Sequence, residues 1–235
     1  MIKEDEIFSL QQGHRARLRK KFLDGQLAEY EIIELLLTYA IPRRDVRNLS
    51  RQLYKKYGGL HQLLSASYES LMENDGIKEN TATFFKVIHK LMEIDCKFRL
   101  NEKPIFYEYP RLERYCKLIL GGKPIEEFHV LYMDSQFRLI EDQLHSSGTI
   151  DWAAVYVREI VKKALDLNAS NIVLLHNHPS QITSFSSEDI LITDELAAAL
   201  ENLKIKLYDH LLVSGDIVYS ARNMRFLDKY EKRNK

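Results

Sequence analysis

The first hundred residues place apolar and polar side chains at helical spacing. In residues 30–39 a run of apolar side chains begins among Glu29, Glu31 and Glu34, and acidic groups near a helix start are favoured by the helix dipole. Pro42 cannot continue this helix. Further helices are predicted at residues 46–54, at 60–64, around 71 after a Ser67 cap, and from 81 through 94.

The pattern changes at residues 100–110, which contain two prolines and lose the helical period. We place a domain boundary there, with a helical domain at 1–103 and a second domain at 104–235. In the second domain, apolar runs of strand length alternate with amphipathic helices, which predicts an α/β domain with a mixed β-sheet covered by helices. Its predicted strands are 129–133, 136–144, 171–175, 205–213 and 217–220, and its predicted helices are 111–121, 152–168 and 188–203.

Composition narrows the class of protein. Hydrophobic residues make up 45% and charged residues 29% of the 235 residues, which excludes a disordered chain. No apolar run approaches the roughly 20 residues that cross a bilayer, and no secretion signal is visible. Cys96 and Cys116 are too few for a disulfide scaffold or a cysteine zinc site. We therefore expect a cytoplasmic protein that does not enter membranes.

Two histidines follow the apolar run at 171–175. His176 and His178 are two residues apart, so strand alternation points both imidazoles to one face, at the carboxyl end where ligands gather in α/β sheets. Pro179 takes the chain out of the sheet. Asp189 lies eleven residues past His178, at the start of the next helix, and that loop can return its carboxylate to the strand end. Two imidazoles and one carboxylate are a common catalytic zinc set, with a fourth position left for water.

Ordinary structural roles compete with this interpretation. His176 and His178 could be partly buried histidines without a ligand, although their spacing favours a metal. Ser186-x-x-Asp189 is also a helix capping box. Both roles are compatible, since Ser186 can cap the helix while Asp189 binds metal.

The spacing of these residues carries a resemblance to a known family. His176-x-His178, followed after seven residues by Ser186-x-x-Asp189, resembles the metal motif of JAMM/MPN-type metalloproteases. Within that group the chain resembles the RadC family, once called DNA repair proteins. The segments that carry this second resemblance are residues 176–180, Arg158-Glu159, Ala164-Leu165 and Asp209-His210. The resemblance implies a three-layer α-β-α domain of the MPN/JAB type, similar to the cytidine deaminase fold.

The resemblance also implies a role for each matching residue. His176, His178 and Asp189 would bind Zn²⁺, and Ser186 would donate a hydrogen bond to the oxyanion or to the metal-bound water. The family pattern requires an upstream glutamate as general base at the beginning of a strand, and Glu126 is our choice. A one-residue slip would substitute Glu127, but strand alternation sends the two to opposite faces, so one of them can serve.

The chain departs from the family pattern at four positions. Gln181 stands where glycine is usual, Phe185 and Val157 where proline is usual, and Gln143 where a glutamate is often found. The metal ligands are intact. We therefore expect the loop at 181–185 to have a different shape, with a larger effect on substrate preference than on metal binding.

Two further polar sites have functional and structural interpretations. Glu159 could support a ligand histidine or could be a solvated helix charge. Asp209-His210 could be a pair that supports the metal ligands, and His210 alone is more often a hydrogen-bonded core histidine. A cytidine deaminase zinc site is excluded because the chain lacks the required cysteine pair.

Two function classes follow. The first is a zinc-dependent hydrolase of peptide or isopeptide amide bonds, with a peptide or protein substrate. The second is a DNA-associated repair or accessory protein whose metal site is structural or vestigial.

Residues 13–21 are basic, and Gly76-Ile77-Lys78 resembles the hairpin of helix-hairpin-helix modules. The net charge is zero, so any DNA binding should be weak, non-specific and sensitive to salt.

Overall fold

A computed structural model describes residues 4–102, 109–148 and 155–228. Contacts divide the chain into two compact units, Met1–Lys90 and Leu91–Lys235, and the division falls inside one long helix. The boundary that the sequence predicts, between residues 103 and 104, lies outside the described residues. Within the described residues, no helix is both long and apolar enough to cross a membrane.

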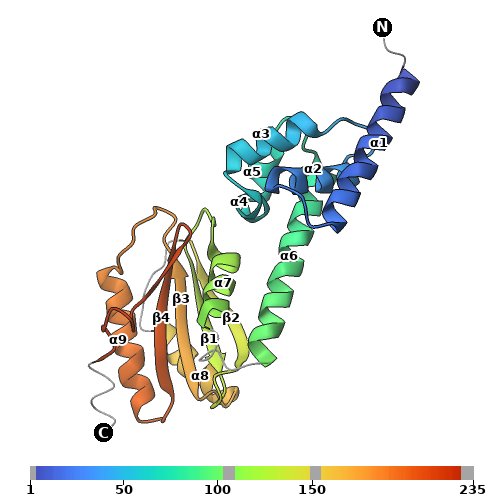
Figure 1. The fold of residues 1–235 in the computed structure, drawn as a ribbon. Coiled ribbons are helices and arrows are strands. Elements are labelled where there is room, and N and C mark those ends of the chain that lie inside the picture. Colours follow the sequence, from blue (N-terminus) through green and yellow to red (C-terminus); the bar gives the residue numbers. More distant parts are fainter. Residues whose placement is uncertain (1–3, 103–108, 149–154, 229–235) are drawn as a thin grey trace. The chain divides into compact units, whose positions relative to one another are not determined.

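The first unit is entirely helical in its described part (Figure 1). Its core is built from buried leucines and isoleucines such as Leu18, Ile33 and Leu53. Ser67 caps a helix as predicted, because its hydroxyl oxygen accepts a hydrogen bond from the Ser70 N–H at 3.1 Å. The helices are α1 (Glu4–Leu23), α2 (Glu29–Ala40), α3 (Arg47–Tyr57), α4 (Leu60–Ser65), α5 (Tyr68–Met72) and α6 (Glu79–Glu102), the last of which continues into the second unit.

The second unit is a five-stranded mixed sheet with the strand order β2-β1-β3-β4-β5. β1 pairs antiparallel with both β2 and β3, β3 pairs parallel with β4, and β4 pairs antiparallel with β5. This confirms the predicted α/β class. The elements are α7 (Tyr109–Leu120), β1 (Glu127–Met133), β2 (Leu139–Ser147), α8 (Val155–Asp166), β3 (Asn171–Asn177), α9 (Ser187–Glu201), β4 (Lys206–Ser214) and β5 (Ile217–Ser220).

Helices cover both faces of this sheet, which gives three layers (Figure 1). On one face Leu131 and Val173 pack with α7, and on the other Val130 and Leu174 pack with α8 and α9. β3 is buried along its whole length, which includes the apolar run at 171–175 for which this burial was predicted. Successive side chains of β1 and β3 therefore pack alternately into two separate hydrophobic cores, one on each face of the sheet.

Several element boundaries differ from the predictions, and the start of β2 differs for an identifiable reason. β2 starts at Leu139 and not at residue 136, because the β1–β2 connection is a longer turn. The Asp134 carboxylate accepts hydrogen bonds from the N–H groups of Gln136 and Arg138, and Phe137 adopts a φ of +58°. This local hydrogen bonding competes with the strand that the apolar pattern favours.

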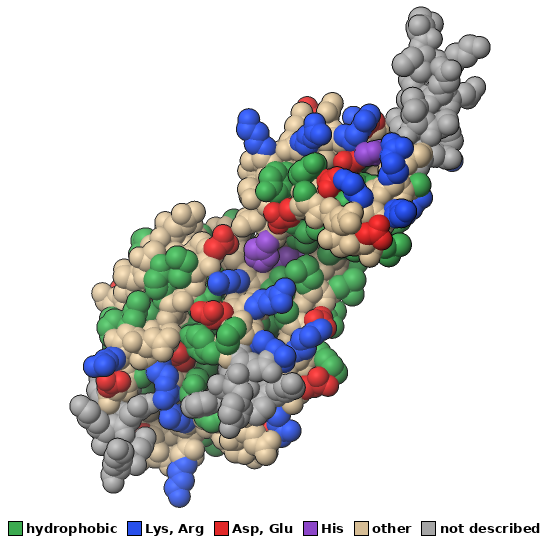
Figure 2. Space-filling view, viewed as in Figure 1, with side chains coloured by type: hydrophobic (Ala, Val, Ile, Leu, Met, Phe, Trp, Pro, Cys, Tyr) green, Lys and Arg blue, Asp and Glu red, His purple; other side chains and the backbone are tan. Residues whose placement is uncertain are grey.

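Charged side chains of both signs are interspersed on the visible face of the molecule (Figure 2). This distribution agrees with the zero net charge of the chain.

Candidate metal centre

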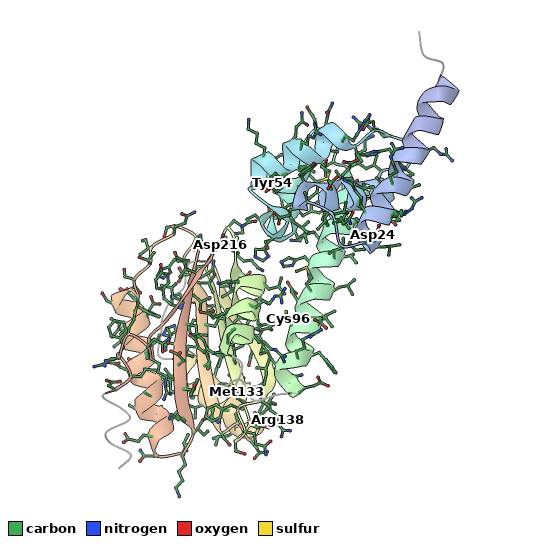
Figure 3. The ribbon with its side chains drawn as sticks, in the orientation of Figure 1. Asp24, Tyr54, Cys96, Met133, Arg138 and Asp216 are labelled. Carbon is green, nitrogen blue, oxygen red and sulfur yellow. The ribbon has the colours of Figure 1, made fainter. Side chains whose placement is uncertain are left out.

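The carboxyl end of β3 supplies the two histidines. His176 is fully buried, and His178 is half-buried one residue past the strand. The two Nε2 atoms lie 3.2 Å apart, so both imidazoles point to the same place, as their spacing predicts. This end of the sheet is the one next to the β4–β5 turn, which the Asp216 label marks in Figure 3, and it is opposite the end that Met133 marks.

The start of α9 supplies the carboxylate. Ser186 is the N-cap: its Oγ accepts a hydrogen bond from the Asp189 N–H at 3.1 Å, and the Ser186 N–H donates to Asp189 Oδ2 at 2.7 Å. This reciprocal capping box holds the Asp189 carboxylate toward the histidines, where Oδ1 lies 3.3 Å from His176 Nε2 and Oδ2 lies 3.5 Å from His178 Nε2. The observed capping geometry is therefore compatible with the predicted ligand role of Asp189.

Glu126 completes the cluster from the residue just before β1. One ligand atom from each of Glu126, His176, His178 and Asp189 lies within 4.8 Å of all the others. Burial raises the pKa of the Glu126 carboxyl, against the lowering effect of His176 and His178. Burial would also raise the pKa of Asp189, but hydrogen bonding and attraction from His176 hold it well below its usual value.

Glu127 lies apart from this cluster. Its carboxylate accepts a hydrogen bond from Lys123 Nζ at 3.0 Å and lies 3.4 Å from His129 Nε2. The structure therefore brings Glu126, and not Glu127, to the histidines.

A residue that the sequence analysis missed holds Glu126 in place. The Asn177 side chain accepts a hydrogen bond from the Glu127 N–H at 2.8 Å and donates to the Ile125 carbonyl at 3.1 Å. These two peptide groups flank Glu126, so one amide ties its backbone to the end of β3. The position of Asn177 between the two histidines is the only signal in the sequence that could have drawn attention to it.

The buried atoms of the cluster suit a divalent cation. The Ile182 carbonyl lies 3.2 Å from His178 Nδ1 and can only accept, so that nitrogen carries the proton and Nε2 offers its lone pair to the cluster. Asp189 Oδ1 is buried, and it lies 3.3 Å from His176 Nε2 without the geometry of a full hydrogen bond. A lone pair and an anionic oxygen that face one another are stabilised by a cation between them. Two imidazoles and carboxylates are ligands that zinc accepts.

A second layer of hydrogen bonds lies behind His176. Its Nδ1 is 2.9 Å from His210 Nε2, and His210 Nδ1 is 2.7 Å from Thr193 Oγ1. The Thr193 hydroxyl donates to the backbone carbonyl of Asp189 at 2.5 Å. His210 is fully buried, and burial lowers the pKa of its imidazole well below the ordinary value.

The other candidate residues lie outside the cluster. Glu159 is exposed on α8. The Asp209 carboxylate accepts hydrogen bonds from the N–H groups of His210 and Arg222 and from the Ser220 hydroxyl, so it joins β4 to β5 and the segment that follows. Asp209 is thus a structural group, whereas His210 contacts His176, a candidate ligand.

Two of the departures from the family pattern lie in the loop between the candidate ligands. Gln181 adopts a φ of +59°, a left-handed conformation that favours glycine. Phe185 packs its ring 5.9 Å from that of His176 and 5.1 Å from that of His210. Phe185 therefore helps to shield the inner histidines from water.

Comparison with known proteins agrees with this fold and site. Residues 107–226 match the model of the RadC-like JAB domain. The chain belongs to the RadC-like JAB domain family. This confirms the resemblance that the histidine and aspartate spacing indicated.

Relatives of the RadC-like chain span nearly the same length. UPF0758 protein FN0909 of Fusobacterium nucleatum is 39% identical over 219 residues, which are 89% of this chain and 94% of the relative. UPF0758 protein SPO0054 of Ruegeria pomeroyi is 36% identical over 91% of this chain and 97% of the relative. A UPF0758 protein of Rhodobacter capsulatus is 36% identical over 83% of this chain and 93% of the relative.

Proposed function

We propose that the JAB domain is a zinc-dependent hydrolase of peptide or isopeptide amide bonds. The observation that carries this proposal is the convergence of His176, His178 and Asp189 on one point with Glu126 beside it, all within 4.8 Å. His176, His178 and Asp189 would hold Zn²⁺, which when bound makes water acidic enough to act as a nucleophile near neutral pH.

Glu126 would transfer the protons of this reaction. As a carboxylate it accepts a proton from the attacking water, and it then returns that proton to the leaving amine. Burial favours its protonated form, which helps the second transfer. Because Asn177 holds the peptide groups on both sides of Glu126, the base stays next to the ligands.

Ser186 would stabilise the charge that develops on the substrate. Its Oγ accepts a hydrogen bond from the Asp189 N–H, which leaves its hydroxyl proton for donation to the oxyanion. One such donor contributes roughly 3 kcal/mol to transition-state stabilisation in comparable sites.

Metal content tests the first step. Elemental analysis of wild type should give about one zinc per chain, and His176→Ala should lose it. Equally low zinc in the two proteins would contradict the proposal.

Hydrolysis tests the second step. With peptide and isopeptide libraries as substrates, Glu126→Gln should keep its zinc and lose at least about 100-fold in rate. Glu127→Gln is the matched control and should keep both properties, since the Glu127 carboxylate binds Lys123 and His129. Unchanged turnover in Glu126→Gln would remove it as the general base.

We propose weak, non-specific DNA binding as a second function of the helical unit. Gly76 lies in the turn before α6 with a φ of +92°, which lets a backbone approach closely, and Lys78 is exposed two residues later. Arg44 also reaches this turn, because its guanidinium lies 3.6 Å from the point where a Gly76 Cβ would be.

Binding to labelled duplex DNA across a salt series tests this second function. Affinity should fall steeply with salt, and Lys78→Ala should reduce the slope by about one. Lys162→Ala, an exposed lysine on α8, is the control and should leave the slope unchanged. No detectable binding at low salt would exclude the function.

A further inference from the structure

We propose that Thr193 and His210 are positioning residues that fix the proton of His176 on Nδ1 and so keep the His176 Nε2 lone pair directed into the metal cluster. This inference rests on the proposed metal site. Thr193 and His210 lie behind His176 and take no part in the proposed reaction, and the inference gives them a role in orienting that histidine.

The backbone of α9 decides which group donates in the first of these hydrogen bonds. The carbonyl of Asp189 can only accept, so the Thr193 hydroxyl, 2.5 Å away, must give it its single proton. The Thr193 oxygen can then only accept from its other partner. That partner is His210 Nδ1 at 2.7 Å, which must therefore carry a proton.

The next step passes through His210. Its imidazole is fully buried and has the aromatic rings of Phe128 and Phe185 at 6.2 and 5.1 Å, an environment that favours the neutral ring. A neutral imidazole with its proton on Nδ1 has a lone pair on Nε2. That lone pair faces His176 Nδ1 at 2.9 Å, so His176 is the donor and its proton lies on Nδ1.

The reverse order of protons is unfavourable. If the Thr193 hydroxyl donated to His210, its oxygen would face the Asp189 carbonyl oxygen at 2.5 Å with no proton between them. Two acceptors at that distance repel each other. The separation between Thr193 and the Asp189 carbonyl therefore fixes the direction at that end, and the neutral His210 ring fixes it at His176.

This chain of bonds also links two of the ligands. It begins at the backbone carbonyl of Asp189, runs through Thr193 and His210, and ends at His176, whose Nε2 lies 3.3 Å from Asp189 Oδ1. The first turn of α9 thus positions Asp189 as a ligand and also sets the protonation of the facing histidine. Partners of this kind behind a ligand typically contribute a factor of about 10 to 100 in metal affinity.

Zinc affinity tests the role of each group. Competition with a chelator of known affinity should show that Thr193→Val, which removes the acceptor at nearly constant volume, weakens zinc binding about 10- to 100-fold. Thr193→Ser keeps the hydroxyl and should bind zinc like wild type. His210→Leu should show a loss of the same size as Thr193→Val, and His210→Gln should recover part of it because its side-chain carbonyl can accept from His176 Nδ1.

His145→Gln is the matched control. This histidine lies on β2 with its Nε2 3.3 Å from the Tyr132 hydroxyl, and neither group belongs to the cluster. His145→Gln should leave zinc affinity unchanged. Wild-type affinity in a folded Thr193→Val protein would overturn the inference.

Histidine tautomers in the wild-type protein give a test that needs no variant. Long-range ¹H–¹⁵N spectra of protein labelled in its histidines, recorded without metal at pH 8, should show the proton on Nδ1 in both His176 and His210. An Nδ1 without a proton on either ring would overturn the inference. If wild type binds no zinc but shows both Nδ1 tautomers, the proposed function fails and the proton chain stands.

Discussion

Asp209 is a buried carboxyl whose ionisation should cost the protein stability as the pH rises. It is 1% exposed, and burial raises its pKa from the ordinary 3.8 to about 6, against the lowering effect of its hydrogen bonds with the Ser220 hydroxyl and the N–H groups of Arg222 and His210. The folded protein therefore binds this proton more tightly than the unfolded chain does. The stabilising contribution is complete below about pH 4 and is lost as the pH rises through about 6.

The size of the effect follows from the same pKa values. A change from 3.8 to about 6 converts to about 3 kcal/mol of unfolding free energy, at about 1.4 kcal/mol for each pH unit. Asp209→Asn cannot ionise, so the difference in unfolding free energy between the variant and wild type should shift by about 3 kcal/mol in favour of the variant between pH 4 and pH 7.

Urea unfolding at four pH values, followed by circular dichroism with a chelator present, measures this difference. Ser220→Ala is the graded control. The Ser220 hydroxyl donates to the Asp209 carboxyl at 2.6 Å and lowers its pKa, so removing the hydroxyl should raise that pKa further. The loss of unfolding free energy with rising pH should then extend to higher pH than in wild type. Parallel curves for wild type and Asp209→Asn across this range would refute the reasoning.

Three further predictions concern the elements that hold the site. Asn177→Ala should leave zinc affinity unchanged and lower the rate of hydrolysis, because Glu126 loses its backbone support; zinc titration and turnover of the same samples separate the two effects. Leu196→Ala should cost about 2–5 kcal/mol in urea unfolding because Leu196 is fully buried, whereas Leu191→Ala, 54% exposed on the same helix, should cost less than about 0.5 kcal/mol. Gln181→Gly should relieve about 1 kcal/mol of left-handed strain, partly offset by chain entropy, and a lower thermal midpoint would contradict this.

Much of the fold is readable from local sequence. The apolar run at 171–175 predicts a strand covered on both faces, and β3 is buried along its length. Ser186 and Asp189 predict a capped helix start, and the capping box is present. Such features depend on residues a few positions apart, so local hydrogen bonding and side-chain alternation suffice to define them.

Part of the candidate site follows from local sequence, and part follows from the tertiary structure. Strand alternation explains why His176 and His178 point together, and that argument needs no tertiary contact. It also separates Glu126 from Glu127 onto different faces, but it does not say which face meets the histidines. The answer comes from the antiparallel pairing of β1 with β3, which places Phe128 opposite His176 and so brings the start of β1 to the end of β3.

The hydrogen bonds that hold the candidate ligands in place depend on the tertiary structure alone. Asn177 reaches peptide groups fifty residues away, and His210 meets His176 because β4 lies parallel to β3. Sequence pattern reports which residues favour a strand, a cap or a buried face, because those preferences act over a few residues. Which strands become neighbours depends on the free energy of the whole packed sheet, so the partners of each ligand became visible only once the chain was folded.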